Sequence, residues 1–147
     1  MTDAAEALLL RSDRDGVATL VLNRPKGRNA LSLAMLEALR EAFARLATDD
    51  GIRAVVLAAE GPDFCAGHDL KEMNGHRDDS DNGRAFFQDT MLACAALMPA
   101  LVRCPEPVLA AGDGLATAAR RPLPARCSLA AAPGHPPPFT PVATIAL

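Results

Sequence analysis

The chain has 147 residues, of which 50% are hydrophobic and 22% charged, enough for one globular domain with a core mainly of alanine, leucine and valine. A formal net charge of −3 and the absence of tyrosine and tryptophan argue against a nucleic-acid-binding protein. We expect no apolar run long enough to cross a bilayer, and the acidic N-terminus is unlike a secretory signal or a transit peptide, so we expect a cytoplasmic protein with no membrane partner.

The first part of the chain predicts a β-hairpin followed by a helix. Residues 7–11 and 17–23 are β-compatible, and the segment between them carries an Asp-Gly turn signal. Ser32 is the predicted N-cap of a helix that runs to about residue 48. One apolar stripe follows the helical period and comprises Leu33, Leu36, Leu39, Phe43 and Leu46.

The middle of the chain alternates short apolar strands with helices. Strands are predicted over 53–59 and 108–111, a short helix from about Asp69, and a longer helix over 84–103. The longer helix is expected to bury Phe87, Met91, Cys94 and Met98 on one face. This order predicts an α/β fold with a largely parallel sheet.

The composition changes near residue 119. Residues 1–118 contain all 18 acidic residues, whereas most of the 12 prolines lie in residues 119–147. Proline removes a backbone donor, so the second segment is unsuited to a regular helix or a central strand. We therefore predict a globular region over 1–118 and an irregular, proline-rich tail over 119–147, and interpret the tail as degenerate or as the product of a shifted reading frame.

Three segments carry a family resemblance. Residues 22–31 read LNRPKGRNAL, residues 53–57 (RAVVL) precede FCAGHDLKEM at 64–73, and residues 107–116 read PVLAAGDGLA. Together, in this order, they resemble the enoyl-CoA hydratase/isomerase (crotonase) family. The resemblance implies the N-terminal part of the crotonase spiral α/β fold, and family domains are markedly longer than this chain.

The resemblance also implies a site. Its substrate would be an acyl-CoA thioester, so coenzyme A would arrive with the substrate and no separate cofactor is expected. The N–H groups of Ala66 and Ala119 would form an oxyanion hole, a low-cost way to stabilise charge on a thioester oxygen. Ala66, Gly67, His68 and Asp69 would lie along the substrate, and Arg24 and Lys26 near its phosphates. Homotrimers or hexamers would be the expected assemblies.

The sequence departs from the family at both catalytic glutamates. The corresponding positions hold Pro122 and Val142, which can neither donate nor accept a proton. General acid–base help is typically worth about 10²–10⁴-fold in rate. We therefore expect an oxyanion-stabilising protein with weak or no turnover.

Other interpretations remain open. One is a non-catalytic CoA-binding or subunit-interaction protein. Another is a dinucleotide-binding oxidoreductase domain, suggested weakly by Gly112-Asp113-Gly114 after a strand. Asp69 could serve only as a helix cap. No metal site is expected, because the histidines, cysteines and acids match no zinc spacing, and the four cysteines are expected to be reduced thiols.

Overall fold

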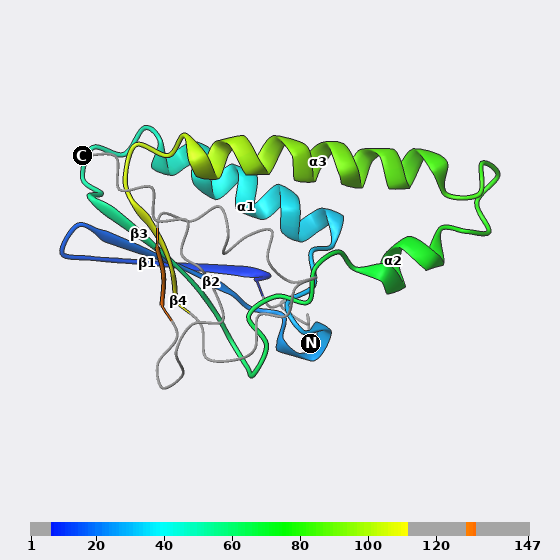
Figure 1. The fold of residues 1–147 in the computed structure, drawn as a ribbon, viewed down its shortest axis with the longest axis horizontal. Helices are drawn as coiled ribbons and strands as arrows, with labels where there is room; N and C mark the ends of the chain where they lie inside the picture. The colour runs from blue at the N-terminus through cyan, green and yellow to red at the C-terminus, as the bar shows by residue number, and fades with distance from the viewer. Residues whose placement is uncertain (1–6, 112–128, 132–147) are drawn as a thin grey trace, which may run out of the picture.

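The computed structural model describes residues 7–111 and 129–131 (Figure 1). Five strands form one sheet in chain order. They are β1 (Leu9–Arg14), β2 (Val17–Leu22), β3 (Ala54–Ala59), β4 (Val108–Ala111) and β5 (Leu129–Ala131). Neighbours from β2 to β5 pair in parallel, whereas β1 pairs with β2 in the antiparallel sense. The predicted α/β architecture with a largely parallel sheet is confirmed.

The hairpin between β1 and β2 is closed by a two-residue turn. Asp15 and Gly16 have φ values of 52° and 80°. Two consecutive left-handed residues match the twist of paired strands, and an Asp-Gly pair tolerates them well. The predicted Asp-Gly hairpin is therefore confirmed.

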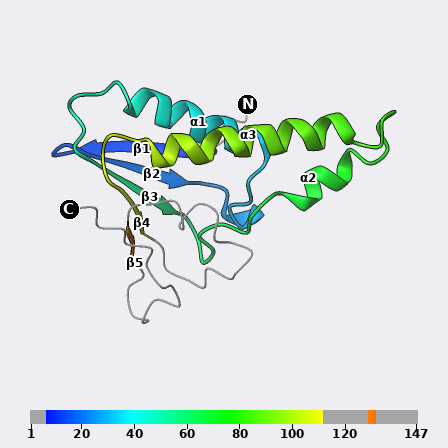
Figure 2. The same ribbon diagram turned by 45° about the horizontal axis from the view of Figure 1, so that its top comes forward.

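Three α-helices connect the strands within the described ranges. They are α1 (Leu33–Leu46), α2 (Leu70–Gly75) and α3 (Arg84–Val102), and a short 3₁₀ helix covers Pro25–Gly27. Figures 1 and 2 show α1 and α3 side by side over the same face of the sheet. The start of α3 and all of α2 extend beyond the end of the sheet, where the loop between them turns back.

Helix α1 begins at its predicted cap. The Ser32 hydroxyl accepts a hydrogen bond from the Met35 N–H at 3.2 Å, which satisfies one of the helix's unpaired donors. Leu36, Leu39, Phe43 and Leu46 are buried as the stripe predicts. Leu33 is only half-buried, and Met35 is fully buried in addition.

The core lies between the sheet and the two long helices. Alternate residues of β2, β3 and β4 are buried, as expected for strands covered on one face. Their largest buried side chains include Leu20, Leu22, Val55 and Leu57. Helix α3 completes the core with Leu97 and Leu101, which are 0% and 2% exposed.

The buried face of α3 differs from the predicted one. Thr90, Leu97 and Leu101 are buried, whereas Phe87 is 53% exposed and Met91, Cys94 and Met98 are half-buried. The helix is apolar on several faces, so spacing alone did not identify the face that meets α1. The end of α3 that carries Phe87 also projects beyond the sheet (Figure 1).

Helix α3 also corrects the expectation about apolar runs. Over 18 of its residues the mean hydropathy is 1.5 with 17% of the window buried, so α3 is long and apolar enough by length and composition to cross a bilayer. Such length is weak evidence for a span, because helices that cover a sheet can share it. In the described structure, α3 packs against α1.

Part of the predicted irregular tail forms a strand. β5 pairs in parallel with β4, with Leu109 opposite Leu129 and Ala111 opposite Ala131. It is three residues long and occupies an edge of the described sheet, where proline-rich surroundings are tolerated. The predicted boundary at residue 118 and the remainder of the tail lie outside the described residues.

Candidate functional site

Two loops meet at one end of the parallel sheet. Residues 23–32 follow β2 and residues 60–69 follow β3, so both leave the carboxyl ends of adjacent parallel strands, where α/β proteins commonly place binding sites. The Leu31 N–H donates to the Gly67 carbonyl at 2.8 Å, and the Asp69 N–H donates to the Leu31 carbonyl at 3.1 Å. These two bonds form a one-residue parallel bridge between Leu31 and His68.

Asn29 holds the two loops together. Its side chain is buried, and its backbone is left-handed with φ of 50°. The Oδ1 atom accepts from the Arg24 N–H at 2.8 Å, and Nδ2 donates to the carbonyls of Glu60 and Asp63 at 2.8 and 2.7 Å. Asn29 lies in the LNRPKGRNAL segment, but no pattern in that segment predicts that its side chain bonds to carbonyls more than 30 residues away.

Arg24 and Asp69 form an ion pair across the same loops. The Arg24 Nη1 and Asp69 Oδ2 atoms are 2.5 Å apart, and the Asp69 side chain is 9% exposed. Asp69 also accepts from the N–H groups of Lys71 and Glu72, each at 3.1 Å. Asp69 is therefore the N-cap of α2, as the capping interpretation predicts.

The ionisation of Asp69 follows from these contacts. Burial acts to raise the pKa of Asp69, but the hydrogen bond from Arg24 and the bonds from the N–H groups of Glu72 and Lys71 outweigh it and lower the pKa. The carboxylate is thus held ionised by groups that anchor the loop. Arg24 is engaged in that anchor, whereas Lys26 lies exposed on the neighbouring 3₁₀ helix.

The small-residue loop, which comprises Ala66 and Gly67 and ends at Asp69, leaves the His68 N–H free of the Leu31 and Arg28 bonds. The Ala66 N–H donates to the Arg28 carbonyl at 3.0 Å, so in this conformation it is occupied by the chain itself. Gly67 is left-handed with φ of 87°, a conformation that glycine adopts without steric cost. The Leu31 bridge engages the Gly67 carbonyl and the Asp69 N–H, so the His68 N–H between them faces the other side.

His68 also carries an unsatisfied side-chain atom. Within the described ranges, no backbone acceptor is recorded for the His68 N–H, and its buried Nδ1 has no hydrogen-bond partner. Buried polar atoms are normally paired, so the Nδ1 atom is an exception, and the His68 N–H is the donor of this loop that can still bind another group. No cluster of three histidine, cysteine or acidic side chains suited to a metal occurs in residues 7–111.

The second half of the predicted site lies outside the described residues. This applies to Ala119, to Pro122 and Val142 at the glutamate positions, and to the Gly112-Asp113-Gly114 segment. The structure therefore brings together Arg24, Gly67, His68 and Asp69 on two adjacent loops. Ala66 belongs to the same loop, but its N–H is directed at Arg28.

Comparison with known proteins identifies the family. Residues 12–134 match the family model described as Enoyl-CoA hydratase/isomerase. The match covers most of the chain and includes both loops of the site. The chain therefore belongs to the enoyl-CoA hydratase/isomerase family, as the three sequence segments indicated.

Individual relatives agree with this assignment. The chain is 40% identical over 119 residues to the rat mitochondrial enoyl-CoA hydratase domain-containing protein 3, covering 81% of this chain and 38% of that protein. Its fold is similar to a Mycobacterium smegmatis enoyl-CoA hydratase, with a TM-score of 0.74 and 51% identity over 86% of this chain and 48% of that one. Human enoyl-CoA hydratase domain-containing protein 3 gives a TM-score of 0.75 and 36% identity over the same shares. The chain spans less than half the length of these relatives.

Proposed function

We propose that the chain binds an acyl-CoA thioester at the two loops and stabilises negative charge on the thioester oxygen with backbone N–H groups. The family supports a CoA thioester as the ligand, because its members include hydratases and a protein named 4-chlorobenzoyl coenzyme A dehalogenase-2 from Arthrobacter. Charge on a carbonyl oxygen is the common feature that a pair of fixed N–H groups would stabilise.

The observation that carries this proposal is the orientation of the His68 N–H. Because the Ala66 N–H is bound to Arg28, we assign the first oxyanion donor to His68, two residues further along. Gly67 on one side and Asp69 on the other are fixed by bonds to Leu31, so the donor is held before a ligand arrives. Ala119 remains our proposed second donor.

The cations of the first loop take different parts in this proposal. Arg24 holds Asp69 and so positions the loop, rather than binding a phosphate directly. Lys26 is exposed on the 3₁₀ helix and is the residue we propose as the phosphate contact of coenzyme A. Neutralising Lys26 with Lys26→Gln should weaken CoA binding and reduce its dependence on salt.

We propose weak or absent hydration. Pro122 and Val142 hold the positions where a proton donor and acceptor would be expected, so an N–H pair alone would stabilise the enolate without completing proton transfer. Non-catalytic CoA binding is the second candidate for the same reason.

A homotrimer or hexamer is the assembly we propose, and sedimentation equilibrium of the purified chain measures it.

Paired variants at His68 test the donor. His68→Ala removes the imidazole but keeps the N–H, whereas His68→Pro removes the N–H itself. Calorimetric titration with acetyl-CoA should show similar affinity for the wild type and His68→Ala. The affinity of His68→Pro should be lower than that of the wild type by about tenfold or more. Circular dichroism checks that each variant is folded.

The same proteins test turnover. The ultraviolet absorbance of crotonyl-CoA is lost when its double bond is hydrated, and we expect the rate of that loss to be near the uncatalysed rate.

Equal binding by His68→Ala and a folded His68→Pro would refute the donor assignment. A rate close to that of full-length hydratases would refute the inactivity.

A further inference from the structure

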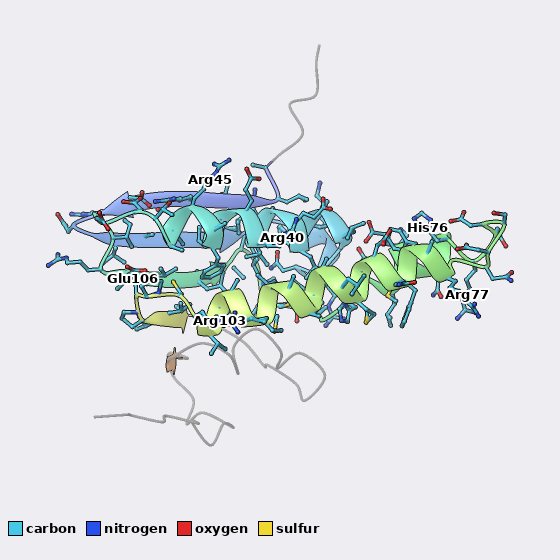
Figure 3. All side chains as sticks on the ribbon, turned by 90° about the horizontal axis from the view of Figure 1, so that it is seen from above. Arg40, Arg45, His76, Arg77, Arg103 and Glu106 are labelled. Atoms are coloured by element: carbon cyan, nitrogen blue, oxygen red, sulfur yellow. The ribbon has the colours of Figure 1, made fainter. Side chains whose placement is uncertain are left out.

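A hollow of about 560 Å³ lies between α2 and the start of α3, outside the two loops. Its walls include Leu70 and Met73 from α2, Phe86 and Phe87 from α3, and the two arginines Arg77 and Arg84. Figure 3 shows Arg77 beside the beginning of α3, at the end of the molecule away from β4. This hollow begins directly after Asp69, where the small-residue loop ends.

The lining changes character with distance from that loop. Leu70 and Met73 lie three residues apart on α2, and Arg77 lines the same hollow two residues after α2 ends. The near end is therefore apolar and the far end cationic. Leu70 and Phe87 are 68% and 53% exposed, so the apolar wall is open to a ligand.

The two arginines have no acidic partner in the part of the chain that the structure describes. Two of the acids in the loop between α2 and α3 are already engaged. Asp79 pairs with His76 at 2.8 Å, and Asp81 accepts from the N–H groups of Gly83 and Ala85 at 3.0 and 2.7 Å. Asp78 follows Arg77 in the sequence and is exposed, and it is the third carboxylate of that loop, which would compete for the cations.

The shape of the far end is fixed by packing. The His76 ring stacks on Phe86 with centroids 3.8 Å apart. Gly83 is left-handed with φ of 76°, and a Cβ there would lie 2.8 Å from the His76 carbonyl oxygen. These contacts hold the turn between α2 and α3, which brings Arg77 and Arg84 to the same hollow.

We propose that this hollow binds the far end of an acyl chain that carries a terminal carboxylate, with the methylenes over Leu70 and Phe87 and the carboxylate at Arg77 and Arg84. The inference rests on the proposed function, because it places the thioester at His68. Leu70 and Arg77 are seven positions apart, which is about 10 Å at the helical rise of α2 and the turn that follows it. That length corresponds to roughly eight to ten carbons of an extended chain.

Two thioesters that differ only at their far end test the assignment. Decanoyl-CoA and the mono-CoA thioester of decanedioic acid are titrated into the full chain by calorimetry at low and high salt. We expect the carboxylated thioester to bind about three- to tenfold more tightly, a modest factor because both arginines are exposed. Added salt should reduce that preference.

Charge variants connect the preference to the hollow. Arg77→Gln combined with Arg84→Gln should make the two thioesters bind equally, while Arg77→Lys should keep most of the preference. Arg103→Gln, at the opposite end of α3, removes an exposed arginine elsewhere and should leave the preference unchanged. Circular dichroism of each variant confirms that it is folded.

The possible failures are separable. Equal binding of the two thioesters by the wild type overturns the inference and leaves the proposed function standing. A preference that survives the double variant also overturns it. If neither thioester binds more tightly than coenzyme A alone, the proposed function fails, and the inference fails with it.

Discussion

Replacing Asn29 with aspartate should release the two loops of the site from each other. Asn29→Asp keeps the size of the side chain and the acceptor for the Arg24 N–H, but it replaces the Nδ2 donor with an oxygen. That oxygen would face the Glu60 and Asp63 carbonyls, which now lie 2.8 and 2.7 Å from Nδ2. Both carbonyls would lose this donor, and a carboxylate would be buried against them.

The expected loss can be worked from these contacts. Both carbonyls belong to residues that are not fully buried, so the loss is taken from the two hydrogen bonds themselves. Each contributes about 0.5–1.5 kcal/mol, which gives roughly 1–3 kcal/mol of unfolding free energy, with the burial of a carboxylate adding to it. Such a loss is a large part of the stability of a typical domain. Because the chain lacks tryptophan and tyrosine, urea unfolding is followed by far-ultraviolet circular dichroism.

Asn82→Asp is the matched control for this measurement. Asn82 has the same left-handed backbone, with φ of 56°, but it is exposed. The same substitution there should change the unfolding free energy by about 0.5 kcal/mol or less. Equal losses in the two variants, with unchanged denaturant dependence, would refute the role we assign to the Asn29 side chain.

Two further predictions concern the ion pair and the core. The lowered pKa of Asp69 means that its stabilising effect is present above the ordinary carboxyl pKa and is lost as pH falls through the lowered value. Asp69→Asn keeps a good N-cap but removes the charge, so it should cost about 1–3 kcal/mol at pH 7 and flatten the acid side of a stability profile measured by urea unfolding; an unchanged profile would contradict this. Leu97→Ala should cost about 2–5 kcal/mol because Leu97 is 0% exposed, whereas Leu92→Ala, at 59% exposure, should cost far less, and comparable losses would contradict the assigned face of α3.

Local signals in the sequence predicted the elements well. The Asp15-Gly16 turn, the Ser32 cap and the Asp69 cap each depend on residues within three positions of one another. The apolar stripe of α1 was also predictable, because its opposite face is polar enough to give a clear helical period.

Features that depend on distant residues could not be predicted in the same way. The Asn29 bonds reach carbonyls 31 and 34 residues away, and a main-chain carbonyl leaves no pattern in a sequence. The pairing of Arg24 with Asp69, 45 residues apart, is of the same kind. Which N–H of the small-residue loop is free depends on which of its N–H groups bond to Leu31 and Arg28. The sequence therefore located the segment, but it could not identify the N–H that faces away from those bonds.

The two ends of α3 differ in how far they are buried against the core, which divides this helix into two regions. Its last turns are anchored by Leu97 and Leu101 against the core, whereas its first turns extend past the sheet and carry an exposed Phe87 (Figure 1). Amide protons in the first turns should therefore exchange with solvent through partial openings that leave the sheet intact, and those in the last turns only when the core opens. A ligand held between α2 and α3 would slow exchange in the first region alone.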